Sequence, residues 1–397
     1  MRKQPMRFGV FCSPHHRPGR NPTLYLQQDL QLCEHLDKLG FDEIWWGEHH
    51  SGGFEIVSAP DVFIAAAAER TRRLMLGTGV LSLPYHHPFI VAGRMTLLDH
   101  LTRGRVMFGF GPGALVQDAE MMGIDVNEAR DRLEVGLEAL VQLLEDDEPV
   151  SMETDWFRLR DARLNLGPYT YPRMELAIAS VRSPVGPRCA GRFGLSLLSL
   201  SPTAGAGFDF LKDTWGIAEE RAGAANRKIE RSSWRLVGTV HVANDYDTAV
   251  DQVSWGFDDA LRFSAATATG VDAEAIIASS SHRERVEEFN AGKQGLVGTP
   301  AMTIEFIERL IDQAGGFGTF LIRLPDLAPF ESRLASLELF AHEVMPYFQG
   351  SSVKQEEAWT RLYAARSETT SRLRSAQDLY AVRHGDTRSA GDTPSAP

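Results

Sequence analysis

Cysteine is scarce in this chain, and long hydrophobic runs are missing. The 397 residues include only Cys12, Cys33 and Cys189, whose spacing matches no metal motif. This excludes a disulfide framework and favours a reducing compartment. No apolar run approaches the roughly 18–20 residues that span a bilayer, and the first residues lack the apolar core of a signal peptide. These absences predict a cytoplasmic protein.

An excess of positive charge is also missing. The chain carries 41 Lys and Arg against 53 Asp and Glu, a net charge of −12. This balance argues against non-specific binding to nucleic acid or to a membrane surface. The length suits one large α/β barrel or two ordinary domains.

Strand and helix signals alternate along the chain. Eight short apolar runs are each typical of a strand, and helical segments separate them. The runs are residues 7–12, 43–47, 74–83, 106–110, 174–179, 195–200, 234–242 and 319–324. Because parallel strands need crossover helices, the pattern predicts an α/β protein with a (β/α)8 TIM barrel over residues 1–350.

Several stretches depart from this alternation. Residues 151–166 predict a hairpin excursion, and residues 247–263 predict one helix. Residues 264–298 are polar with little periodicity, which predicts an insertion near strands seven and eight that forms a mobile loop. Residues 351–397 predict a charged C-terminal extension, with one or two exposed helices and a disordered tail from Gly385.

Six of the twelve histidines form three adjacent pairs that follow the first three strands: His15-His16, His49-His50 and His86-His87. The carboxyl ends of the strands form the active-site face of a (β/α)8 barrel, so the pairs are expected to meet there. Imidazole exchanges protons near neutral pH or binds a metal when neutral. Neighbouring side chains on a strand point to opposite faces, and the HxH and HExxH spacings are missing. A shared metal is therefore disfavoured, while structural and catalytic roles at the rim both stay open.

A second kind of signal is suited to phosphate. Gly111-Pro112-Gly113 follows the fourth predicted strand, where it either allows close backbone approach or forms a tight turn. Residues 180–186 (SVRSPVG) follow the fifth. There the hydroxyl groups, Arg182 and the amides at a helix start would cradle a phosphate. The alternative is an ordinary helix start after Ser-Pro.

Six local strings, taken in order, resemble the bacterial luciferase-like flavin-dependent monooxygenase superfamily. The resemblance covers residues 7–348, the whole predicted barrel. The strings are residues 41–50 (FDEIWWGEHH), 77–88 (GTGVLSLPYHHP), 97–110 (LLDHLTRGRVMFGF), 123–125 (GID) with Arg130, 297–301 (VGTPA) and 339–348 (LFAHEVMPYF).

The resemblance implies a two-component monooxygenase. Reduced flavin mononucleotide (FMN) would come from a separate NAD(P)H:flavin reductase and would react with O2 to give a C4a-(hydro)peroxyflavin. That species would oxygenate a hydrophobic organic substrate. The resemblance also implies a homodimer and no metal. Two alternatives stay open: an oxidoreductase of the same fold that depends on the deazaflavin F420, and a flavin-binding protein without catalysis.

Individual residues follow from the resemblance. His49 matches the family's catalytic histidine, and Glu48 beside it would orient an imidazole. Gly79-Val80 falls where the family has a non-prolyl cis peptide under the flavin ring, and this bond is predicted to be cis. The remaining cofactor-binding residues implied are Gly111, Arg182, Ser183 and Gly186.

The resemblance says less about the residues that would bind the substrate. Residues 84–92 and 111–122 are similar to limonene-monooxygenase-like members of the superfamily, which favours a hydrophobic substrate. The predicted pocket residues are His16, Trp46, His86 and Leu115. In one respect the chain departs from the family, because Pro112 stands where the luciferase α-type subunit has an arginine.

Overall fold

The first 349 residues form a closed barrel of eight parallel strands. The computed structural model describes residues 5–12 and 15–385. Contacts divide the chain into two units, residues 1–349 and 350–397. The barrel strands, in spatial order, are β1 (Arg7–Cys12), β2 (Glu43–Trp46), β3 (Met75–Ser82), β4 (Val106–Gly111), β7 (Glu175–Ser180), β8 (Ser196–Ser199), β9 (Arg235–Val242) and β11 (Thr319–Arg323). Pairing of β11 with β1 and of β8 with β9 closes the ring, which confirms the predicted (β/α)8 barrel.

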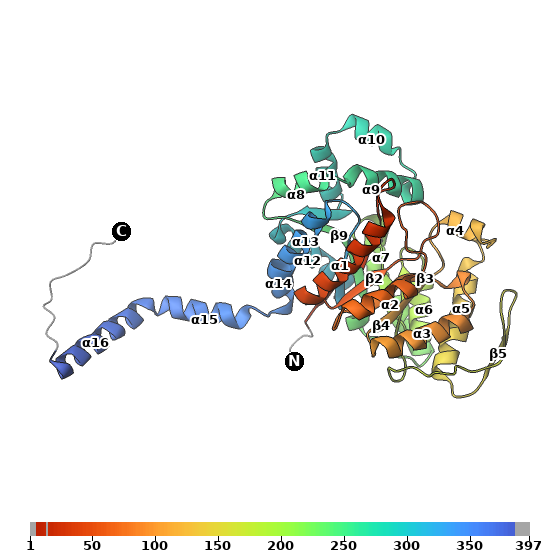
Figure 1. Cartoon of the computed structure of the whole chain (residues 1–397), viewed down its shortest axis with the longest axis horizontal. Coiled ribbons are helices and arrows are strands. Elements are labelled where there is room, and N and C mark those ends of the chain that lie inside the picture. Colours follow the sequence, from red (N-terminus) through yellow and green to blue (C-terminus); the bar gives the residue numbers. More distant parts are fainter. Residues whose placement is uncertain (1–4, 13–14, 386–397) are drawn as a thin grey trace. The chain divides into compact units, whose positions relative to one another are not determined.

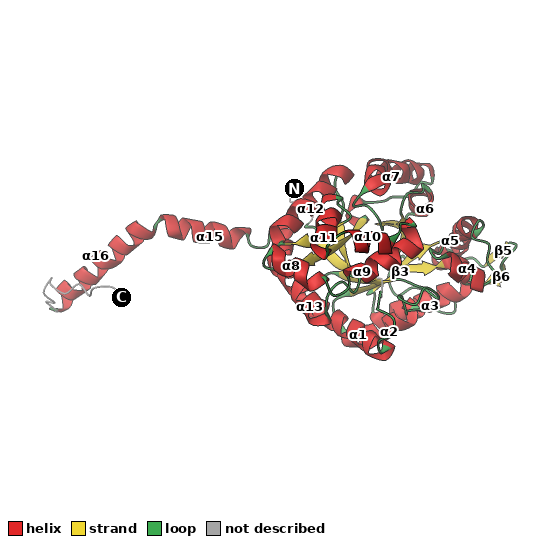
Figure 2. Ribbon diagram, turned by 90° about the horizontal axis from the view of Figure 1, so that it is seen from above, coloured by secondary structure: helices red, strands yellow, loops and turns green. Residues whose placement is uncertain are grey.

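Helices surround the strands as an outer layer (Figure 2). They are α1 (Pro22–Leu39), α2 (Pro60–Arg70), α3 (Pro88–Thr102), α5 (Ala129–Glu145), α6 (Val185–Phe193), α7 (Gly205–Ala224), α8 (Tyr246–Val253), α12 (Pro300–Ala314), α13 (Phe330–Leu339) and α14 (Met345–Gln349). Capping residues in the sequence set where these helices begin and end. Asn21 caps α1 through its side chain, and Gly40 closes it with a φ of 83°, a left-handed conformation that suits glycine.

Two apolar layers hold the barrel together. The inner layer fills the barrel with side chains such as Phe11, Trp45, Met107 and Leu198. The larger outer layer packs the strands against the helices. Because neighbouring side chains on a strand point to opposite faces, Trp45 lies inside the barrel while Trp46 is fully buried outside it. The ring of Trp46 lies 5.3 Å from that of Phe63 on α2.

Strand β3 contains an irregularity at its carboxyl half. Its register against β4 shifts between Thr78 and Leu81, so one extra residue is accommodated there. The Gly79-Val80 peptide bond within this segment is cis, which confirms the prediction for that bond.

The expectation of a loop over residues 264–298 was wrong, because the segment is largely helical. It contains a π turn, α10 (Ala273–Ser279), α11 (His282–Ala291) and strand β10 (Gly295–Gly298). These helices are too short and too exposed to show an apolar period, so their caps define them. Asp272 caps α10, and Ser281 with Glu284 forms a capping box on α11.

The single helix expected over residues 247–263 is instead two, α8 and α9 (Phe257–Ser264). The break falls at Gly256, where a side chain would collide with the backbone carbonyl of Asp326. Helices α9, α10 and α11 form a layer over the mouth of the barrel, which is the carboxyl end of its strands (Figures 1 and 2). Strand β10 pairs with residues 239–242 of β9, while β8 pairs only with Arg235 and Leu236.

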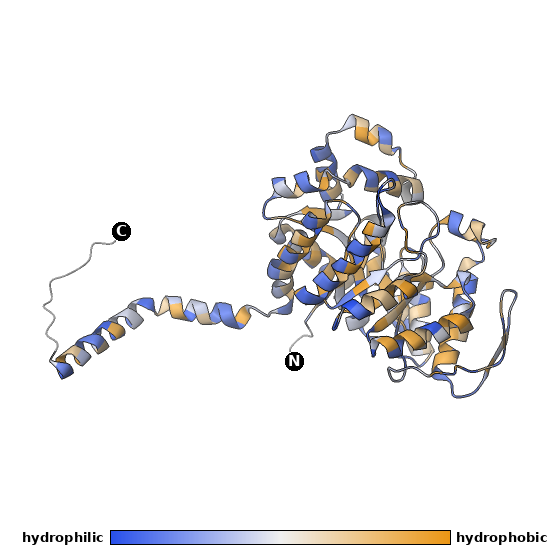
Figure 3. Cartoon of the chain, in the orientation of Figure 1, coloured by the Kyte–Doolittle hydropathy of each residue, from blue (hydrophilic) through white to orange (hydrophobic). Residues whose placement is uncertain are grey.

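The predicted excursion over residues 151–166 is a hairpin of β5 (Val150–Glu153) and β6 (Arg158–Ala162). The second unit holds two exposed helices, α15 (Val353–Ala364) and α16 (Arg366–His384), with no buried residues. Figure 3 shows hydrophilic residues interspersed with hydrophobic ones along both helices. Residues 386–397 of the predicted disordered tail lie outside the described residues. Among the helices described, none has both the length and the hydropathy to cross a membrane.

Candidate active site

The three histidine pairs follow the carboxyl ends of β1, β2 and β3, and carboxylates bind four of the six imidazoles, those of His16, His49, His50 and His86. Within residues 5–12 and 15–385, no group of three or more His, Cys, Asp or Glu is arranged to hold a metal ion. Instead, three separate networks form, centred on Glu48, His49 and His16.

Glu48 joins the ends of β2 and β3. It is buried and accepts hydrogen bonds from the backbone N–H of Ser82 at 2.7 Å, from Nε2 of His86 at 2.7 Å and from Nε2 of His50 at 3.0 Å. Burial would raise the pKa of this carboxyl group, but the hydrogen bonds outweigh burial and lower it. Glu48 is therefore a carboxylate that fixes two imidazoles with their Nε2–H groups pointing at it.

His49 lies between two other carboxylates. Its Nε2 is 2.7 Å from Glu55, and its Nδ1 is 3.4 Å from Asp118 on α4 (Val116–Met121). Burial favours the neutral ring, but the two carboxylates outweigh it and raise the pKa of His49. The side chain keeps 16% exposure, so its ring can be reached from the mouth of the barrel. Glu55 and Asp118 were not predicted, because neither belongs to a motif.

His16 lies below the mouth rather than in a pocket. Its imidazole stacks on Tyr25 and bonds Asp29 of α1 at 2.9 Å and Asp326 at 3.4 Å. Arg333 of α13 pairs with Asp326 at 2.7 Å. Burial opposes protonation, but the two carboxylates outweigh it and raise the pKa of His16 to about 9.

This network predicts a pH-dependent stability. The folded pKa of His16, about 9, lies above the unfolded value of 6.5. Its contribution to the free energy of unfolding, on the order of 3 kcal/mol, is therefore complete below about pH 6.5 and is lost as the pH rises through about 9. Chemical denaturation of the wild-type chain and the His16→Gln variant should show a difference that shrinks across this range. A difference that does not change with pH would contradict the assignment.

The cofactor-binding residues implied by sequence gather at β3, β4 and β7. A Cβ on Gly111 would lie 2.6 Å from Cγ2 of Val80, so the glycine lets the end of β4 lie against the irregular segment of β3. A Cβ on Gly186 would lie 2.5 Å from the carbonyl oxygen of Ala179, so the glycine lets α6 start directly against β7. Ser183 accepts a hydrogen bond from the amide of Val185 at 3.3 Å. Arg182 is exposed, and its side chain has no ion pair or hydrogen bond among the described residues.

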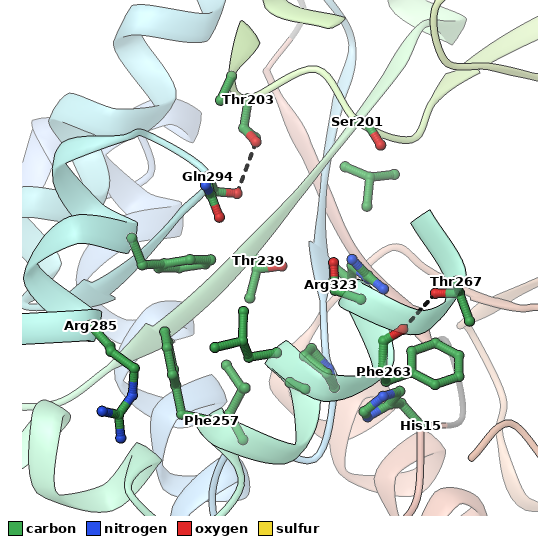
Figure 4. Close-up of a pocket in the computed structure, with 18 of the residues that line it drawn as sticks. His15, Ser201, Thr203, Thr239, Phe257, Phe263, Thr267, Arg285, Gln294 and Arg323 are labelled. Carbon is green, nitrogen blue, oxygen red and sulfur yellow. Dashed lines mark hydrogen bonds between the residues drawn. The ribbon is translucent and has the colours of Figure 1, made fainter. Parts of the chain in front are cut away.

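A cavity of about 420 Å³ opens on the other half of the mouth, under α9 to α11 (Figure 4). It lies at the ends of β8, β9, β11 and β1. The polar residues among its lining are His15, Ser201, Thr203, Thr239, Ser264, Thr267, Arg285, Glu288, Gln294 and Arg323. Aromatic rings of Phe257, Phe263 and Phe289 supply much of its apolar surface.

The four residues predicted to line a substrate pocket, His16, Trp46, His86 and Leu115, are not among the residues that line this cavity. Trp46 packs behind the strands, and His16 is replaced at the cavity by its neighbour His15. His86 belongs to the network of Glu48. Leu115 is buried next to Phe263, since both side chains approach Gly52. Sequence reasoning missed the ends of β8, β9 and β11 because these strands end without a recognisable motif.

The chain is similar to known monooxygenases. A family model described as luciferase-like monooxygenase matches residues 6–316. Limonene 1,2-monooxygenase of Rhodococcus erythropolis is 42% identical over 343 residues, which are 86% of this chain and 87% of that protein. The 4-hydroxyprotoasukamycin monooxygenase of Streptomyces nodosus subsp. asukaensis is 41% identical over 346 residues, 87% of this chain and 92% of that protein.

The fold is also similar to that of a solved structure. It is a type II Baeyer–Villiger monooxygenase, the oxygenating constituent of 3,6-diketocamphane monooxygenase from Pseudomonas putida, in complex with FMN. It superposes with a TM-score of 0.72 at 25% identity, and the match covers 86% of this chain and 98% of that one.

Proposed function

The chain belongs to the luciferase-like monooxygenase family, and we propose that it is the oxygenase component of a two-component system that uses reduced FMN and O2 on a hydrophobic substrate. One observation carries the proposal. The irregular end of β3, the glycine end of β4 and the start of α6 follow three successive barrel strands, while the cavity lies at the ends of β8, β9, β11 and β1. The mouth therefore offers separate places for a flat cofactor and for an apolar substrate.

The residues present fit FMN. At the start of α6 the backbone amide of Gly186 has no acceptor among the described residues, and the hydroxyl group of Ser183 and the guanidinium of Arg182 lie beside it in sequence. Such a set suits a phosphate. Gly79, Val80 and Gly111 would support the ring. When bound, reduced FMN would supply the activation of O2. Because Pro112 brings no cation to this side, Arg182 is the side chain we assign to the phosphate.

The chain's own residues would then orient groups, hold a proton and exclude water. Glu48 fixes His50 and His86 beside the cofactor side. His49, whose pKa the nearby carboxylates of Glu55 and Asp118 raise, would donate a proton from its ring. Helices α9 to α11 cover the cavity and would keep water from the reacting atoms.

Two partners are part of the proposal. Reduced flavin would come from a separate NAD(P)H:flavin reductase. The similar structure supports this, because it is the oxygenating constituent of 3,6-diketocamphane monooxygenase. We also propose a homodimer. Large apolar side chains are exposed on α2 and along one side of α3, namely Val62, Ile90, Leu97 and Leu101, and such a patch is typical of an interface. Sedimentation should give twice the chain mass of 44.0 kDa, whereas a single chain mass would contradict the dimer.

The cofactor assignment is tested by reconstitution. The full chain is mixed with limonene and with either photoreduced FMN or reduced F420, in the presence and absence of O2. We expect oxygenated product only with reduced FMN and O2, and we expect Ser183→Ala together with Arg182→Met to weaken FMN binding by about tenfold. Turnover with reduced F420 under anaerobic conditions would instead identify a hydride-transferring oxidoreductase. FMN binding without turnover on any substrate would identify a flavin-binding protein.

A further inference from the structure

The wall of the cavity holds a cation and an imidazole that have no side-chain hydrogen bond or ion pair among the described residues. They are Arg323, at the end of β11, and His15, just after β1 (Figure 4). The two strands are neighbours, and Phe11 of β1 lies in register with Arg323. The other arginine of the cavity, Arg285, is already satisfied, because Asp258 binds its guanidinium through bonds of 3.0 Å to both Nε and Nη2.

Arg323 is a partly buried cation that lacks a counter-ion. Across residues 5–12 and 15–385, no hydrogen bond or ion pair engages its guanidinium. Burial lowers its pKa, and Glu55 is the carboxylate that opposes this effect. Glu55, however, is held by His49 at 2.7 Å. A buried charge without a partner is costly, so such groups are normally paired. The missing partner of Arg323 would therefore come from a ligand.

His15 is the second unpartnered group. It is 3% exposed, and its Nδ1 has no hydrogen-bond partner among the described residues. The ring stacks on Phe54 at 4.7 Å and meets the edge of Phe263 at 4.5 Å between centroids. Burial lowers the pKa of His15 to about 4, and Arg323 contributes to that lowering. At neutral pH it is an uncharged imidazole that can donate or accept one hydrogen bond.

We propose that Arg323 and His15 form the binding site for an oxygen acceptor, a carbonyl or carboxylate, on an otherwise apolar substrate. The apolar body of that substrate would pack on Phe257, Phe263 and Phe289, and its oxygen would lie toward β11 and β1. The inference rests on the proposed function, since it names the substrate class of the same site. It goes beyond hydrophobicity, because a hydrocarbon would leave both polar groups unsatisfied.

The place of Arg323 in the barrel separates this site from the cofactor side. The bulge of β3, Gly111 and the start of α6 lie on β3, β4 and β7. Arg323 lies on β11, which pairs with β1 and β9. Thr239 of β9 lines the same cavity (Figure 4), and so do residues of α9, α10 and α11.

Three ligands with one carbon skeleton test the proposal: limonene, its ketone carvone, and the carboxylate perillate. Binding to the full chain is measured by calorimetry without flavin. We expect carvone or perillate to bind about tenfold more tightly than limonene, and we expect Arg323→Met to remove that preference, as loss of a charge-assisted hydrogen bond requires. The oxygenated ligand with the larger loss identifies the acceptor. Arg323→Lys should restore part of the preference, and His15→Phe should reduce it.

Controls separate this site from a general effect of charge and from the cofactor. Arg160→Met removes an exposed arginine on β6 and should change no affinity. Oxidised FMN should bind the wild type and Arg323→Met equally. The proposal is overturned if limonene binds as tightly as both oxygenated ligands, if Arg323→Met keeps the preference, or if that variant loses FMN affinity instead. Failure of the proposed function would look different, because carvone would still bind but no oxygen would be transferred.

Discussion

Replacement of His49 by alanine is expected to lower product formation by about 10²-fold or more, with binding of FMN and of substrate largely kept. Removing a positioned proton donor typically costs about 10²-fold to 10⁴-fold in rate. We assign this role to His49, because Glu55 at 2.7 Å and Asp118 at 3.4 Å lie beside its ring nitrogens and raise its pKa. Single-turnover product yield per reduced FMN is the measurement.

The pH profile separates a proton donor from a structural histidine. Because the pKa of His49 is raised, the wild-type yield should stay level near neutral pH and fall once the pH exceeds that pKa. The His49→Ala variant should lose this limb. His100→Ala is the control, because that histidine is exposed on α3 and bonds only a backbone carbonyl. An undiminished yield in His49→Ala would remove His49 from the proton-donating role.

Replacement of Arg235 by methionine is expected to lower the free energy of unfolding by about 3–5 kcal/mol, the usual cost of breaking a buried ion pair. Arg235 is fully buried at the amino end of β9. It donates two bonds to Glu43, at 2.6 and 2.9 Å, and one to Glu175 at 2.6 Å. Its guanidinium also lies 4.9 Å from the ring centre of Trp45. Without it, Glu43 is a buried charge without a partner.

Urea denaturation tests this network against matched variants. Arg192→Met removes an exposed arginine that pairs with Glu134 and Glu138, and it should cost at most about 1 kcal/mol. Adding Glu43→Gln to Arg235→Met should recover part of the loss, because it removes the orphaned charge. A loss below about 1 kcal/mol in Arg235→Met would show that the buried network contributes little to stability.

Most of the fold could be predicted from the sequence because barrel strands are buried on both faces. Such strands appear as continuous apolar runs, and β1 was located to the residue. The layer of helices over the mouth could not be predicted, because α10 and α11 bury few side chains and their caps are short polar patterns. Continuous apolar runs also hide which side chain faces inward, so Trp46 was assigned to the pocket although Trp45 is the inner one.

The candidate site also has one part that the sequence could predict and one part that it could not. Sequence strings located the ends of β2, β3, β4 and β7, because glycines and histidine pairs mark them. The ends of β9 and β11 carry single residues, Thr239 and Arg323, in ordinary strand contexts. Glu55 and Asp118 acquire their roles only when loops from different strands meet at His49. Contacts of that kind depend on the tertiary fold and leave no pattern in a single sequence.

The central claim, that this chain transfers oxygen from O2 with reduced FMN, is tested most directly by isotope labelling. The full chain, reduced FMN and carvone are mixed with ¹⁸O₂ in a single turnover, and the product is analysed by mass spectrometry. The account predicts product that carries one ¹⁸O atom, and none without the chain. Product without ¹⁸O, or product formed without O2, would contradict it.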